Sequence, residues 1–197
     1  MNTPAHLIIA AALYARPTET KGDGKASATG AALLGGFFPD FSLYFAFVWS
    51  TFVLGRSPET FFGVDYFSPG LQSIFAIDNS FLLTGAVFAL ALWLKRDVLA
   101  AAAGSALIHI AADFPLHHDD GRAHFWPVSD WVFESPVSYW DRNHYGGIVG
   151  ALEIALCLIL LAILFRRFRE WPARTAIVLA AAAQIAPVFA WVLFFGD

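Results

Sequence analysis

The sequence predicts an all-α membrane protein, a polytopic bundle of about five to six transmembrane or partly inserted helices. Hydrophobic residues make up 58% of the chain and charged residues 14%, whereas soluble domains average about 45–50% and about 25%. The mean hydropathy is +0.60. At about 20 residues per membrane helix, the chain leaves little length for a soluble domain. We therefore expect a single integral membrane domain over residues 1–197.

Six apolar stretches account for the predicted helices. They cover residues 4–15, 30–54, 71–94, 98–116, 146–165 and 175–195. The first is too short to cross a bilayer alone, so we expect a partial span or a helix packed among the others. Each of the other five has about the length that a membrane helix needs.

Local residues predict several helix ends. Thr3 suits the N-cap of the first helix, because a threonine hydroxyl there accepts a hydrogen bond from a free backbone N–H. Pro39, preceded by Gly35 and Gly36, is expected to loosen the second helix. Pro115 is expected to end or bend the fourth helix, because proline lacks the N–H that a helix interior uses.

The basic residues predict how the helices are oriented in the membrane. If every stretch crosses, nine of them fall on one side: Arg16, Lys21, Lys25, Lys95, Arg96, Arg166, Arg167, Arg169 and Arg174. The other side carries only Arg56, Arg122 and Arg142. By the positive-inside rule, this asymmetry predicts a multi-pass membrane protein. The long loop 117–145 and both termini then lie on the outer side.

Composition and motifs argue against several other classes of protein. The net charge of −4 and the pI of about 5.8 give no basic surface for nucleic acid. A single cysteine, Cys157, lies in an apolar run, so the sequence predicts neither a disulfide framework nor a cysteine zinc site. The chain also lacks a glycine-rich phosphate loop and a serine-centred nucleophile elbow.

Ionisable side chains inside the apolar stretches are the first indication of a functional site. Each charge placed in a bilayer helix costs at least about 2.5–3.5 kcal/mol, so such residues usually face a partner or a cavity. The residues in question are His6, Asp40, Asp78, His109, Asp113 and Glu153. Most of them fall in the outer half of the predicted membrane, beside the long loop, which indicates one shared site.

His109 and Asp113 form the sharpest local pattern. Their i, i+4 spacing puts both side chains on one helix face, close enough to bind one ion. Imidazole nitrogen and carboxylate oxygen suit zinc, and also manganese or iron. The alternative is a buried His–Asp hydrogen bond. The predicted cofactor is a divalent metal, zinc first and manganese second, with these candidate ligands: His6, Asp40, Asp78, His109 and Asp113.

The loop 117–145 contains four histidines and many aromatic residues. His117, His118 and His124 are the candidates for proton transfer during catalysis, since imidazole is the usual general acid or base near neutral pH. The aromatic residues also suit an interfacial belt at the lipid headgroups. They are Trp126, Trp131, Tyr139 and Trp140.

The sequence leaves two or more roles open for several polar residues near these candidates. Asp119 and Asp120 belong either to the site or to a solvated acidic turn. Asp141 and His144 are either a pair that faces a substrate or a hydrogen bond within the loop. Glu153 is a ligand, a general base or a polar packing contact between helices.

Four segments resemble the YdjM-like family of membrane-bound metal-dependent hydrolases of bacterial inner membranes. They are residues 5–8 (AHLI), 34–40 (LGGFFPD), 108–113 (IHIAAD) and 125–127 (FWP). The family has a histidine that opens the N-terminal helix, an LLPDID segment, an HxxxD helix and a following WP. Order and approximate spacing agree over residues 5–127. The resemblance implies a protein of a bacterial inner membrane, with the loop 117–145 on the periplasmic side, a metal site within the membrane and hydrolase activity. A remoter likeness to zinc-dependent phospholipases C and nucleases favours phosphoesters.

The chain departs from the family at two motifs. The family has Asp-Ile-Asp-His after the proline, where this chain has Asp-Phe-Ser-Leu over residues 40–43. It also has an HRGxTHS motif, where residues 75–80 read FAIDNS and carry no histidine. The resemblance then implies a distinct branch, in which Asp78 or Asn79 replaces one ligand and the loop 117–124 supplies others.

The sequence thus predicts a hydrolase that acts on an amphiphilic ester, with a phosphoester as one class, near the outer face of the membrane. Its partners would be membrane lipid and a lipid-like substrate. The alternative is a protein without enzymatic activity, either an accessory subunit of a larger membrane complex or a small-solute carrier. The buried acids would then be structural pairs, a proton path or a degenerate metal site.

Overall fold

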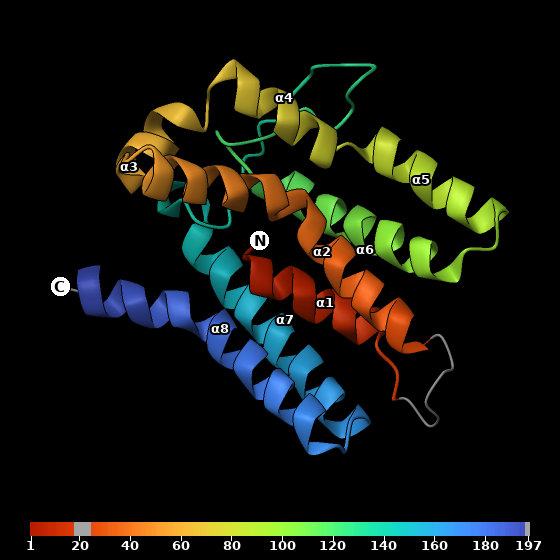
Figure 1. Cartoon of the computed structure of the whole chain (residues 1–197). Coiled ribbons are helices and arrows are strands. Elements are labelled where there is room, and N and C mark those ends of the chain that lie inside the picture. The colour runs from red at the N-terminus through yellow and green to blue at the C-terminus, as the bar shows by residue number, and fades with distance from the viewer. Residues whose placement is uncertain (18–24, 196–197) are drawn as a thin grey trace.

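The computed structural model describes residues 1–17 and 25–195, and throughout these residues the regular structure is helical, without a strand (Figure 1). Lys21, used above to orient the helices, lies outside them. The α-helices are α1 (Thr3–Tyr14), α2 (Lys25–Val48), α3 (Pro58–Thr60), α4 (Pro69–Asp78), α5 (Phe81–Trp93), α6 (Asp97–Asp113), α7 (Gly146–Arg167) and α8 (Trp171–Phe195). Short π- and 3₁₀-helical turns are η1 (Trp49–Val53), η2 (Phe61–Asp65), η3 (Phe114–Leu116) and η4 (Arg142–His144).

The predicted all-α membrane fold is confirmed. Among the described residues, four helical segments are long and apolar enough to cross a membrane: Ala28–Val53, Pro69–Trp93, Asp97–Leu116 and Gly146–Arg167. Helix α1, with 12 residues, is too short to span, as expected. Large apolar side chains lie exposed along the helices, among them Leu34, Trp93, Leu152 and Leu179. Such a surface suits lipid rather than water.

Helix α6 is the best-enclosed span, and it packs between α2 and α5 (Figure 1). Its buried residues are mostly small, including Ala101, Ala103, Gly104 and Ala106. Small side chains let neighbouring backbones approach closely, which is the usual way for membrane helices to associate. Helix α1 lies against α2 and α7, so the short N-terminal helix is held inside the bundle next to α6.

Helix α2 continues through Pro39, and the ribbon of α2 changes direction along its length (Figure 1), which agrees with the expectation that Gly35, Gly36 and Pro39 loosen this helix. The glycines also serve packing. A Cβ on Gly35 would lie 2.0 Å from the carbonyl oxygen of Ala102 on α6. This close contact holds α2 against α6 on the N-terminal side of the proline.

Other helix ends differ in detail from the expectation. Asn2, not Thr3, precedes α1, and the Thr3 hydroxyl bonds to the Asp40 carboxylate instead of capping the helix. The predicted helix 71–94 is divided into α4 and α5, because Ser80 caps α5 and accepts from the N–H of Leu83 at 3.1 Å. Helix α6 ends at Asp113 before a 3₁₀ turn that contains Pro115, as predicted.

The loop 117–145 is anchored on the start of α5. The N–H of Phe81 donates to the carbonyl of His124 at 2.9 Å, and the Ser80 hydroxyl donates to the carbonyl of Trp126 at 2.5 Å. Aromatic rings of Phe81, Phe114 and His124 pack together below it. The loop is therefore a packed part of the structure, and it brings His117 against the end of α6.

Candidate metal centre

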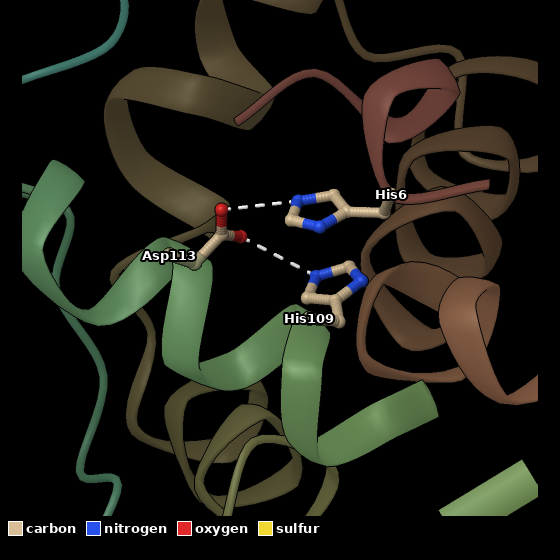
Figure 2. Close-up of side chains that lie close together, drawn as sticks. All are labelled: His6, His109 and Asp113. Atoms are coloured by element: carbon tan, nitrogen blue, oxygen red, sulfur yellow. Dashed lines mark ion pairs between the residues drawn. The ribbon is translucent and has the colours of Figure 1, made fainter. Parts of the chain in front are cut away.

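Three buried side chains bring their ligand atoms together between α1 and α6 (Figure 2). They are His6, His109 and Asp113, and one ligand atom of each lies within 4.8 Å of the others. His6 Nε2 is 3.0 Å from Asp113 Oδ1, and His109 Nε2 is 3.3 Å from Asp113 Oδ2. The i, i+4 pair that the sequence predicted on one face of α6 is thus completed by a histidine from α1.

A backbone contact orients the His109 ring, and the His6 ring stacks on it. His109 Nδ1 lies 2.7 Å from the carbonyl oxygen of Gly36 on α2, so the ring nitrogen donates there and leaves Nε2 with a free lone pair. The His6 ring stacks on the His109 ring at a centroid distance of 3.5 Å and an interplanar angle of 10°. Metal-ligating histidines are typically oriented by such a hydrogen bond from their other nitrogen.

The nitrogens that face Asp113 lack proper hydrogen bonds. His6 Nε2 and His109 Nε2 are buried and have no hydrogen-bond partner, despite their short distances to the carboxylate. Buried polar atoms are nearly always satisfied, so this arrangement calls for a ligand. Tetrahedral zinc with bonds of about 2.0–2.1 Å holds its ligand atoms about 3.3 Å apart, which is close to the distances here. The donor set therefore fits a divalent ion.

Asp40 and Met1 extend this cluster. Asp40 Oδ1 lies 3.7 Å from His109 Nε2, and Asp40 Oδ2 accepts a hydrogen bond from the Thr3 hydroxyl at 2.5 Å. The α-amino group of Met1 contacts Asp113 Oδ1. Asp40 thus presents a second carboxylate to the imidazole that already faces Asp113, and its role as a further ligand stays a prediction.

A pocket of about 580 Å³ opens onto the two carboxylates of the cluster. Its polar lining includes Asp40, Asp113, His117, Asp120 and Arg122. Its walls are largely aromatic and consist of Tyr44, Phe47, Phe62, Tyr66, Phe67, Tyr139 and Trp140. A pocket with apolar walls and a few converging polar groups is the usual form of a small-molecule site.

His117 joins the cluster to the loop. Its Nε2 is 3.5 Å from Asp113 Oδ2, and its Nδ1 is 3.0 Å from Asp120 Oδ1. Burial by itself would lower the pKa of His117, but the two neighbouring carboxylates raise it above its ordinary value. Of the three histidines predicted for proton transfer, His117 is the one that lines the pocket.

His118 and His124 are not among the residues that line this pocket. His118 Nδ1 bonds to the carbonyl of Ser135 at 2.7 Å, and its ring stacks on His144. His124 Nδ1 donates to the carbonyl of Asn79 at 2.9 Å. Burial lowers the pKa of His124 to about 4, so the ring is neutral at pH 7.

Asp78 lies apart from the cluster. It lines a second, mostly apolar pocket of about 630 Å³ together with Phe38, Phe41 and Trp49. It is not one of the three residues whose ligand atoms converge. Its predicted role as a ligand stays a prediction.

The residues with open roles have identifiable partners. Glu153 on α7 accepts hydrogen bonds from the Asn2 side chain at 2.8 Å and from Gln184 on α8 at 2.7 Å. It therefore acts as a polar packing contact that holds the segment before His6. His144 Nδ1 bonds to Asp141 Oδ2 at 2.6 Å within the loop.

Arg122 is the pocket residue that sequence reasoning missed. Its side chain is buried, and the residue is 5% exposed. In the sequence it is one basic residue in a polar loop, and nothing in that pattern distinguishes it from a solvated arginine. Arg122 is buried because the loop packs against α4, and a local sequence pattern does not predict such a contact between distant segments.

Comparison with known proteins adds no further constraint, since no family model, curated protein or solved structure matches the chain.

Proposed function

We propose that this protein is a metal-dependent hydrolase of a bacterial inner membrane, which acts on an amphiphilic ester. The observation that carries the proposal is the pocket of about 580 Å³, whose lining combines Asp113 of the converging group and Asp40 with aromatic side chains. The resemblance to the YdjM-like hydrolases supports the same conclusion, since its matching segments contain His6, Asp40, His109 and Asp113.

The cluster would hold zinc, with manganese as the second choice. Two imidazole nitrogens and carboxylate oxygens are ligands that zinc accepts readily. In this proposal His6, His109 and Asp113 bind the ion, and Asp40 adds a fourth ligand. When bound, such an ion supplies Lewis acidity that activates water and polarises the ester.

The chain's own residues would position the substrate and move the proton. His117, held between Asp113 and Asp120, is placed to accept a proton at the edge of the pocket. Asp120 Oδ1 lies 3.0 Å from His117 Nδ1 and would orient this imidazole, and Asp120 Oδ2 accepts a hydrogen bond from the indole N–H of Trp140 at 3.1 Å. The aromatic walls would hold the apolar part of the substrate and exclude water.

An amphiphilic substrate agrees with the surroundings of the site. The walls are aromatic, and large apolar side chains cover the exposed helix surfaces, so membrane lipid would surround the pocket. With the loop 117–145 on the periplasmic side, the substrate would be a lipid-like ester of the outer half of the bilayer.

Asp113→Asn tests the proposal, because it removes charge from the carboxylate on which the cluster converges. The detergent-purified wild type should contain about one or two equivalents of zinc or manganese and hydrolyse an ester substrate. The variant should lose both the metal and the activity. Elemental analysis and an ester screen measure the two effects.

Asp97→Asn is the matched control, since Asp97 lies exposed at the start of the same helix. It should retain wild-type metal content and activity. A wild type that stays metal-free after resupply would contradict the proposal. Copurification with one stoichiometric partner would then favour an accessory subunit.

A further inference from the structure

Arg122 is a buried cation that, among the described residues, forms no close ion pair. Its Nη1 donates to the side-chain oxygen of Asn79 at 3.1 Å, and its guanidinium lies 4.9 Å from the ring centre of Phe75. Its Nε has no hydrogen-bond partner. Among the ion pairs of the described residues, none joins Arg122 to a carboxylate within 4.0 Å.

An arginine in this position is energetically incomplete. A buried charge is normally paired, and a buried N–H is normally bonded, because both lose their interactions with water. The amide of Asn79, the ring of Phe75, Tyr66 and the more distant charges of Asp40 and Asp113 offset part of this loss, and the Nε stays without a partner. Arg122 lines the same pocket as Asp40 and Asp113, so an anion that enters the pocket would supply the missing partner.

The chemistry of the two common ester classes identifies this anion. A carboxylic ester is uncharged, so it offers a buried guanidinium a hydrogen-bond acceptor but no ion pair. A phosphoester carries negative oxygens beside the bond that is hydrolysed, and its tetrahedral group has enough oxygens to face both the cluster and an arginine. Arginine is also well suited to bind phosphate, because its planar donors match two oxygens at once.

We infer that the pocket takes an ester with an anionic phosphate group and that Arg122 binds this phosphate opposite the His/Asp cluster. The inference rests on the proposed function, since it names the substrate class of the same site. It makes Arg122 a residue that determines specificity for phosphoesters over carboxylic esters.

The test measures binding without turnover. The probe is a short-chain phosphonate analogue of phosphatidic acid, in which a carbon–phosphorus bond replaces the ester bond. Its affinity for the metal-loaded protein in detergent is measured by calorimetry for the wild type and for Arg122→Gln. We expect Arg122→Gln to bind the probe at least about tenfold more weakly, with unchanged metal content.

Arg56→Gln is the matched control. Arg56 lines the other pocket, where it pairs with Asp65, so this variant should bind the probe as the wild type does. A neutral diacylglycerol analogue should bind wild type and Arg122→Gln equally. Unchanged probe affinity in Arg122→Gln would overturn the inference.

Asn79→Asp serves if Arg122→Gln does not fold. It places a carboxylate where Arg122 already donates, so an internal ion pair would compete with the phosphate. Weaker probe binding supports the inference, and unchanged binding overturns it.

Separate readouts distinguish this inference from the proposed function. Probe binding that depends on Arg122, in a protein without metal or hydrolysis, would contradict the proposed function and leave the phosphate subsite supported. Ester hydrolysis with probe binding independent of Arg122 would overturn the phosphate subsite and leave the proposed function supported.

Inorganic phosphate is the second probe. If it binds as tightly as the lipid phosphonate, the ligand is a free phosphate. If it binds much more weakly, the ligand is a lipid headgroup. Both results support the subsite.

Discussion

Four nitrogen groups lie against the carboxylate of Asp113. His6 and the Met1 α-amino group approach one oxygen, and His109 and His117 approach the other. His6 Nε2 and His109 Nε2 remain without hydrogen bonds. A structural His–Asp pair, the alternative interpretation of this motif, would align at least one N–H with the carboxylate. The unaligned geometry therefore favours a metal site.

His124 contrasts with these residues, because its hydrogen bond and its packing are complete enough for a structural role. Burial lowers its pKa to about 4 against an ordinary 6.5, with Arg122 adding to the effect and the bond to the Asn79 carbonyl opposing it. The unfolded chain thus binds more protons between these values. Stability is full above about pH 6.5 and falls as the pH drops toward 4, by up to about 3 kcal/mol.

His124→Asn tests this pH dependence, because an asparagine amide can still donate to the Asn79 carbonyl but does not titrate. Thermal unfolding in detergent between pH 7.5 and pH 4.5 should show a smaller loss of stability in the variant than in the wild type. Equal losses in both proteins would mean that His124 does not control the acid sensitivity.

At the scale of elements, the contact of α2 with α6 builds the site. Gly35 and Gly36 bring the two helices together, and a Cβ on Gly36 would lie 3.1 Å from both Ala10 on α1 and Ser105 on α6. The close approach also puts the Gly36 carbonyl within reach of His109. The same close contact between α2 and α6 therefore packs the two helices and orients the His109 ring.

Gly35→Ala should destabilise the protein, since the new Cβ would meet the backbone of Ala102 at 2.0 Å and the helices must separate. We expect a loss of about 1–3 kcal/mol or more, accompanied by weaker metal binding. Gly30→Ala on the same helix is the control, because a Cβ there meets nothing within 4 Å. It should be neutral or stabilising by up to about 1 kcal/mol. Thermal unfolding and metal content are measured for both variants. Equal losses in Gly35→Ala and Gly30→Ala would contradict the role of Gly35 in packing.

At the scale of the whole molecule, the bundle encloses a short helix that could not span a membrane alone. Helix α1 lies against α2, α6, α7 and α8, and it carries His6 to the cluster. Glu153 on α7 and Gln184 on α8 form a polar contact with each other and with Asn2 ahead of this helix. The outer faces stay apolar, so the polar groups of the bundle gather inside.

The orientation of the bundle is predicted from charge and can be measured with cysteine variants. Asp130→Cys in the loop and Glu170→Cys between α7 and α8 replace two exposed acids that we expect on opposite sides. A membrane-impermeant maleimide applied to intact spheroplasts should label the first and not the second. The native Cys157 is fully buried, so we expect little background labelling of this cysteine by the maleimide. The reverse labelling pattern would invert the predicted topology.

The sequence by itself determined the features that depend on local period and composition. Hydropathy predicted the helices, because the bilayer requires long apolar segments whatever their neighbours are. The i, i+4 spacing predicted that His109 and Asp113 share a face, because the helical repeat sets that relation within one element. The end of α6 before Pro115 followed from the missing N–H of proline.

Only the tertiary structure decided which faces meet. It brought His6 and Asp40 to His109, placed Asp78 in another pocket, and buried Arg122 beside the cluster. These relations depend on the close approach of α1, α2 and α6 and on the packing of the loop. Hydropathy indicates that a helix is buried in lipid but not which way it is rotated, so contacts between helices follow from side-chain packing over the whole bundle.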